Sequence, residues 1–140
     1  STEKKVSAGL REMSMELPVP GILESPFGVF ESKIFSYKKQ KIEEKKYTKW
    51  FDYDKIKNSP CVRTRRQGDY LTVNSEGGRK KLNRIFIDEK IPAEMRDRLP
   101  VVAVGSEILW IPGGRMNEKY KITSTTGRVL ELHYQGGALA

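Results

Sequence analysis

The sequence predicts an α+β fold in which a mostly antiparallel, β-sandwich-like sheet carries two short helices. Strand patterns fill the first half of the chain, helical spacing follows at about residues 80–98, and strand patterns return up to residue 134. The regular alternation of strand and helix that a parallel sheet requires is missing. The 140 residues suffice to bury a core. They form either one continuous domain over residues 11–136, or N-terminal strands and a charged linker over residues 1–50 followed by a domain over residues 51–140.

The first predicted strand is Met13–Leu17, where apolar residues alternate with polar ones until Pro20-Gly21 forms a turn. A second strand is predicted at Phe27–Tyr37, which is rich in aromatic and β-branched residues. We expect a bulge in that strand at Gly28 or near Lys33.

The segment Lys38–Lys46 carries charges of both signs, which predicts a solvated hairpin tip rather than a binding tail. Further strands are predicted at Tyr47–Phe51 and Cys61–Thr64. Between them, Asp52–Ile56 has the pattern of a helical turn, and the break at Asn58–Pro60 ends it.

The second half begins with a helix, because Leu82, Ile85 and Phe86 recur at helical spacing after two glycines. A second short helix is predicted from Pro92 to about Arg98, since proline fits the first helical position. The remaining strands are predicted at Val101–Val104 and Glu107–Ile111, joined by a Gly105-Ser106 hairpin turn, and at Arg128–Tyr134.

The formal net charge of +8 favours an anionic partner. Nucleic acid is the commonest such partner for a basic domain, with a lipid surface or plain solubility as alternatives. No apolar run approaches the roughly 20 residues that span a bilayer, and Ser1–Lys5 shows no apolar signal region, so we expect a cytoplasmic protein without membrane insertion. Cys61 and His133 are the single cysteine and histidine, which excludes a disulfide framework or a Cys/His zinc site within the chain. His133 is predicted on a strand surface.

Little in the sequence suggests bond chemistry. The glycine-rich phosphate loop, the dinucleotide-binding glycine motif and the serine nucleophile turn are all missing from the sequence. Asp52 and Asp54 could bind a cation or act as acid and base, but capping of the neighbouring helical turn is the preferred interpretation. Trp110 is expected in the core rather than in base stacking. A small-molecule enzyme is therefore the least favoured class.

The strongest functional signal is a cationic cluster between residues 63 and 84. On an extended segment, neighbouring arginines point to opposite faces, so at least one row of guanidinium groups should meet a partner. Asp69 could brace one of these arginines, or form a simple ion pair with Arg66. Lysines in the first turn of the predicted helix are unfavourable for the helix itself, which favours a bound phosphate. Nothing in these residues suggests single-strand reading through several exposed aromatics on a sheet face, so a duplex or shaped RNA is the expected target. The candidate contact residues are Arg63, Arg65, Arg66, Lys80, Lys81, Arg84 and Arg115.

Six stretches between Phe51 and Tyr134 resemble the C-terminal region of the bacterial tRNA(Ile)-lysidine synthetase family. They are FDYDKI, VRTRRQGDYL, GRKKLNRIFIDEKIP, RDRLPVV, EILWIPGGR and NEKYKIT. The combination is specific, whereas single stretches would not be. This chain departs from the family at Tyr70 and Asn83, where basic residues are common.

The resemblance implies a module similar to one in the phenylalanyl-tRNA synthetase beta chain. Family members use a PP-loop domain, with ATP and Mg²⁺, to ligate lysine to the wobble cytidine of an isoleucine tRNA. This chain lacks that loop, so we expect it to be inactive alone and to need no cofactor of its own. Its implied partners are tRNA(Ile), at the acceptor stem, and the N-terminal catalytic domain. The alternative is a basic module that docks on the catalytic domain without contacting tRNA.

Overall fold

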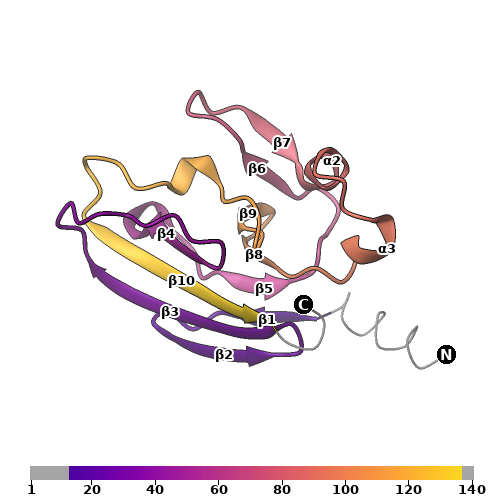
Figure 1. The fold of residues 1–140 in the computed structure, drawn as a ribbon, viewed down its shortest axis with the longest axis horizontal. Helices are drawn as coiled ribbons and strands as arrows, with labels where there is room; N and C mark the ends of the chain where they lie inside the picture. Colours follow the sequence, from indigo (N-terminus) through magenta and orange to yellow (C-terminus); the bar gives the residue numbers. More distant parts are fainter. Residues whose placement is uncertain (1–12, 137–140) are drawn as a thin grey trace.

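A computed structural model describes residues 13–136, so Ser1–Lys5 and the proposed start of a domain at residue 11 lie outside the described residues. Within this part the chain forms two sheets, two short α-helices and two 3-10 turns (Figure 1). The helical elements are η1 (Tyr53–Lys55), α2 (Leu82–Asp88), α3 (Ala93–Arg96) and η2 (Glu118–Tyr120). The strands are β1 (Ser14–Glu16), β2 (Gly21–Ser25), β3 (Gly28–Ser36), β4 (Thr48–Asp52), β5 (Cys61–Arg63), β6 (Tyr70–Thr72), β7 (Arg79–Lys81), β8 (Val101–Val104), β9 (Glu107–Trp110) and β10 (Arg128–Gly136).

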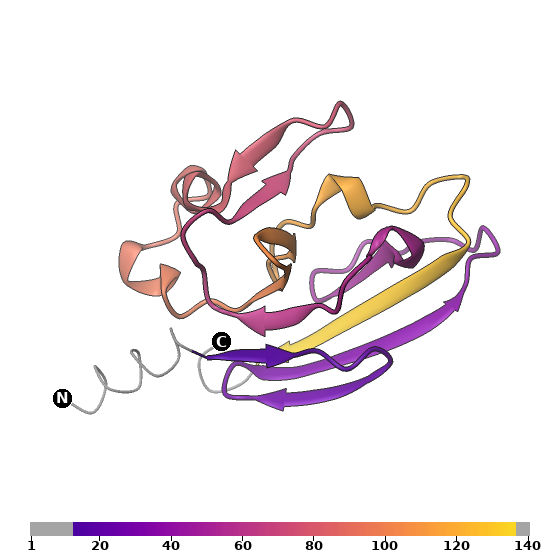
Figure 2. The same cartoon turned by 180° about the vertical axis from the view of Figure 1, so that it is seen from behind.

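The two sheets confirm the predicted α+β class. One sheet has the strand order β1-β5-β8-β9-β6-β7, and the other has the order β2-β3-β10-β4. All pairings are antiparallel except a single parallel bridge between β6 and β9. The β6–β7 hairpin and the two α-helices lie on the side away from the four-stranded sheet in both ribbon views (Figures 1 and 2).

Two cores hold these layers together. The first draws on both sheets and includes Trp110, whose side chain is fully buried as predicted. The second lies between the six-stranded sheet and α2, where the helical spacing of Leu82, Ile85 and Phe86 places all three against the sheet. Fully burying one such side chain stabilises the fold by about 1.5–3 kcal/mol, so both layers depend on these contacts.

The connection at Lys38–Lys46 is not a hairpin tip, which corrects the sequence-based prediction. The strands on either side of it, β3 and β4, do not pair with each other, because β10 lies between them. β10 forms nine consecutive register pairs with β3 and five with β4. That register is continuous, so the expected bulge in β3 is also absent from the described strands.

The sequence pattern did not predict three of the strands, namely β2, β6 and β7. Each has only three to five residues, too few for a clear alternation. The suggested boundary at residue 50 falls inside β4, and strands from both sides of it share one sheet and one core. The hairpin turn at Gly105-Ser106 is confirmed, with Gly105 at a positive φ of 60°.

Asp52 does not cap the helical turn, contrary to expectation. Its side chain makes no capping hydrogen bond to η1 and instead accepts a bond from Thr126 Oγ1 at 3.0 Å in a buried setting. His133 lies on β10, half-buried, with Nδ1 2.7 Å from Thr48 Oγ1. Among the helices of the described residues, none has the length and apolar character needed to cross a membrane.

Candidate nucleic-acid interface

Arg63 is buried within the fold, which corrects its assignment as a contact residue. Its side chain is 2% exposed, and its Nη1 and Nη2 each donate to Asp69 at 2.8 Å. The same two nitrogens also donate to the backbone carbonyls of Thr64 and Gly105. Burial disfavours the charged guanidinium. The hydrogen bonds that Arg63 donates to Asp69, together with the negative charge of Asp69, outweigh this effect and raise the pKa of Arg63. Arg63 therefore braces the 63–69 segment from inside.

Asp69 organises the turn that follows β5. Besides Arg63, its carboxylate accepts the backbone N–H of Arg66 at 2.7 Å, and Gly68 takes a positive φ of 93°. The ion pair that the sequence suggested between Arg66 and Asp69 is thus a backbone contact, and the buried ion pair goes to Arg63 instead. The Arg66 side chain is exposed and has no ion-pair partner among residues 13–136.

Arg65 lies half-buried at the junction of the two α-helices. Its Nε donates to Asp97 at 2.9 Å, next to the end of α3, and its Nη1 donates to Asn83 of α2 at 3.0 Å. Its side chain is 26% exposed, so part of the guanidinium reaches solvent. Arg65 is therefore both a tether between helices and an accessible cation.

Two predicted contact residues pair with one carboxylate, Asp88, at the end of α2, and a third, Arg115, acts on it through its charge. Lys80 Nζ lies 2.7 Å from one oxygen and Arg84 Nε 3.1 Å from the other. The hydrogen bond from Lys80, followed by the charges of Arg84, Lys80 and Arg115, lowers the pKa of Asp88. We call these four residues the Asp88 cluster. It combines three cations with one anion and keeps a net positive charge.

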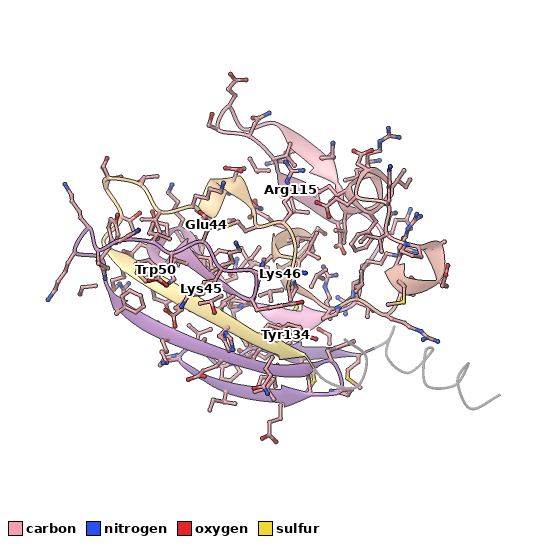
Figure 3. All side chains as sticks on the ribbon, in the orientation of Figure 1. Glu44, Lys45, Lys46, Trp50, Arg115 and Tyr134 are labelled. Atoms are coloured by element: carbon pink, nitrogen blue, oxygen red, sulfur yellow. The ribbon has the colours of Figure 1, made fainter. Side chains whose placement is uncertain are left out.

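Arg115 reaches this cluster from the loop after β9. Its Nη2 lies 3.4 Å from the carbonyl oxygen of Val73, beyond β6, which holds the side chain beside the hairpin. In Figure 3, Arg115 lies toward the β6–β7 hairpin, whereas Lys45 and Trp50 lie on the side of the four-stranded sheet. The view thus separates Arg115 from Glu44, Lys45 and Lys46 of the charged connection (Figure 3).

Lys80 and Lys81 precede the helix and do not lie in its first turn, which corrects the predicted helix start. They belong to β7, where Lys80 pairs with Leu71 and Lys81 pairs with Tyr70. Lys81 then occupies the N-cap position of α2 in extended conformation, without a side-chain cap. Because strand neighbours point to opposite faces, Lys80 turns toward Asp88 while Lys81 turns away from it. Lys81 is exposed and makes no ion pair with any described residue.

One cation that the sequence analysis did not select lies on the same strand. Arg79 is exposed, and its guanidinium carbon lies 4.7 Å from the centre of the Tyr70 ring. A strand assignment for Arg79–Lys81 would have placed Arg79 and Lys81 on one face, but the glycines and lysines of this stretch gave no strand pattern.

The arrangement is suited to holding an anionic polymer. The described residues contain no group of three or more His, Cys, Asp or Glu side chains that could hold a metal ion. Arginine forks and lysine ammonium groups bind phosphate oxygens directly. Six of the seven predicted contact residues keep an accessible or partly accessible charge, and Arg63 alone is withdrawn into the fold.

Comparison with known proteins gives these residues a family. Residues 61–132 match the family described as the TilS substrate C-terminal domain. The chain is 50% identical over 88 residues to a tRNA(Ile)-lysidine synthase of Caldanaerobacter subterraneus subsp. tengcongensis, covering 63% of this chain and 19% of the relative. It is 41% identical over 90 residues to the enzyme of the same name from Clostridium tetani, covering 64% of this chain and 19% of the relative.

A solved structure shares the fold. It is titled as the crystal structure of the TilS C-terminal domain, has 33% sequence identity and superposes with a TM-score of 0.74. The superposition covers 89% of this chain and 96% of the other. The chain spans about a fifth of the length of the curated relatives that it matches. Because the family match covers more than half of the sequence, the chain belongs to the TilS substrate C-terminal domain family.

Proposed function

We propose that this chain is the tRNA-binding part of a tRNA(Ile)-lysidine synthase and that it holds the acceptor stem. The observation that carries the proposal is the Asp88 cluster, in which Lys80 and Arg84 both pair with a single carboxylate and Arg115 adds its charge. A protein that needed only a stable helix end would gain from one cation there, so the excess charge has another use.

Two further exposed cations add to the positive charge of the chain outside the Asp88 cluster. Arg66 begins the turn that Asp69 organises, and Lys81 lies on the edge strand next to Lys80 in the sequence. Neither is neutralised by a carboxylate within residues 13–136. Because such contacts address phosphates and not base edges, they position an RNA without identifying its sequence. Discrimination of one tRNA from another therefore belongs to other contacts of the complete enzyme.

The relatives that match are named for the synthesis of lysidine on tRNA(Ile). We infer that the complete protein ligates lysine to that tRNA with ATP and Mg²⁺, in a catalytic domain outside this chain. The domain described here supplies binding and orientation, since holding a substrate in a reactive geometry accelerates a reaction without any bond chemistry by the holding residues.

The test is a filter-binding titration of a tRNA(Ile) transcript at several salt concentrations. The double variant Lys80→Ala/Lys81→Ala should bind more weakly and reduce the slope of log K against log salt by about one to two units, because each duplex phosphate contact contributes about 0.9. A matched control, Lys33→Ala/Arg128→Ala, removes the same charge from the four-stranded sheet. The control should leave the slope unchanged.

Equal affinity and slope in both double variants would refute the proposal. Nuclease footprinting shows which part of the tRNA the chain covers, and we expect protection on the acceptor arm alone. Protection that appears only after the catalytic domain is added would favour the alternative, in which the basic surface docks on that domain and not on RNA.

A further inference from the structure

A positively charged group of side chains lies on the opposite face of the β6–β7 hairpin from Lys80 of the Asp88 cluster. Tyr70 pairs with Lys81 and Thr72 pairs with Arg79, so these four side chains share one face of the hairpin. The Arg79 guanidinium stacks over the Tyr70 ring at 4.7 Å. We call Tyr70, Arg79 and Lys81 the β7 platform.

A second arginine–tyrosine pair shows what is unusual about this platform. Arg128 lies over the ring of Tyr53 at 5.0 Å, but it also bonds Asp54 through Nε at 2.9 Å and Nη2 at 2.6 Å. The charge of Arg128 is therefore neutralised by Asp54. Arg79 also lies over a tyrosine ring, but it has no carboxylate partner among the described residues. The Tyr70 ring thus positions the guanidinium, and no described acidic side chain neutralises its charge.

We propose that the β7 platform binds an unpaired nucleotide at the end of an RNA duplex, an inference that rests on the proposed tRNA-binding function. Unpaired bases stack on aromatic rings and on guanidinium planes, whereas bases inside a duplex already have both faces covered. Arg79 and Tyr70 offer such a stack, and the free ammonium of Lys81 lies beside it for the phosphate.

The position of the platform fits this occupant. β7 is the outer strand of its sheet, and the hairpin projects away from the four-stranded sheet in both ribbon views (Figures 1 and 2). The Asp88 cluster lies on one face of this edge and the platform on the other. A duplex backbone held by the cluster can therefore continue across the edge as a single strand, which is the form in which an acceptor stem ends.

The experiment compares two RNA probes, an acceptor-stem hairpin with a short unpaired 3′ tail and the same hairpin with a blunt end. The wild-type chain should bind the tailed probe about tenfold more tightly, within the range that one base–aromatic stack contributes. Tyr70→Leu and Arg79→Ala should abolish this preference, while Tyr70→Phe retains it. Tyr53→Leu and Arg128→Ala are matched controls from the neutral pair and should leave the preference intact.

The outcomes separate this inference from the proposed function. Tight, salt-dependent binding of both probes with equal affinity by the wild-type chain would overturn the platform and leave the tRNA-binding function standing. Equal weakening of both probes by Tyr70→Leu would show a structural role for the ring and would also overturn it. If the wild-type chain bound neither probe, both proposals would fall.

Discussion

The substitution Asp69→Ala should destabilise the whole domain, although it lies in the loop that carries the candidate RNA contacts. Within residues 13–136, Asp69 is the carboxylate that pairs with Arg63, and the side chains of Asp69 and Arg63 are only 1% and 2% exposed. Removing it leaves a buried guanidinium with the carbonyl oxygens of Thr64 and Gly105 as acceptors. The guanidinium of Arg63 would then have no counterion, and water could reach it only if the fold opened.

The size of the effect follows from the bonds that are lost. Two charge-assisted hydrogen bonds join Arg63 to Asp69, each worth about 1.5–3 kcal/mol, and breaking a buried pair from one side typically costs about 3–5 kcal/mol. Since domains are stable by only about 5–15 kcal/mol, the loss is a large fraction of the total. With a urea m-value of about 1.5 kcal/mol/M, the midpoint should fall by about 2–3 M.

Urea unfolding followed by circular dichroism measures this directly. The control is Asp54→Ala, which breaks an ion pair whose side chains are 46% and 58% exposed and which should shift the midpoint far less. The double variant Arg63→Met/Asp69→Leu should recover most of the loss, because it removes both charges together. An Asp69→Ala midpoint no lower than that of the control would refute the argument from buried charge.

Two further predictions concern charge and pH. Asp88→Asn should tighten tRNA binding by about twofold and steepen its salt dependence, because it removes the carboxylate that offsets Lys80 and Arg84. Asp54→Asn makes the same change in net charge elsewhere and should leave tRNA binding unchanged. Weaker binding by Asp88→Asn in the filter titration would contradict this prediction. Burial, and then the hydrogen bond to Glu107, raise the pKa of Tyr120 well above its usual 10.0, so stability is fully present below about pH 10 and is lost as the pH rises further. The drop in free energy of unfolding between about pH 8 and about pH 11 should be smaller in Tyr120→Phe, and equal drops would refute it.

The parts of the fold that sequence could predict are those fixed by local pattern. Trp110 belongs to the continuous apolar run Ile108–Ile111, which is typical of a buried strand, and it lies in the core. Gly105 lies between two apolar runs, and it forms the hairpin turn. The position of β10 between β3 and β4 could not be predicted this way, because its register pairs join residues that lie about 80–110 positions apart in the chain.

In the candidate site too, contacts between residues close in the sequence could be predicted, and contacts between distant residues could not. Arg84 and Asp88 are four residues apart on one helix, so their pairing follows from helical spacing. Arg115 joins them only through tertiary structure, from a loop 27 positions beyond Asp88. The burial of Arg63 was the least predictable feature, since one of its carbonyl acceptors, Gly105, is 42 residues away.

Arg63 and Arg66 show how one residue type serves two purposes within a single turn. Both are arginines, yet Arg63 has a bidentate carboxylate partner and lies inside, while Arg66 has only its backbone N–H bonded to that carboxylate and lies outside. Neutralisation by Asp69, and not the identity of the residue, decides which of the two arginines is left accessible for the proposed RNA contact. The planar fork of Arg63 matches the two oxygens of Asp69, so lysine could not replace it. At Arg66 or Lys81 a point charge is sufficient for a phosphate, and exchange between arginine and lysine should preserve most binding. The proposed RNA-binding surface thus depends on a buried ion pair that is not itself part of that surface.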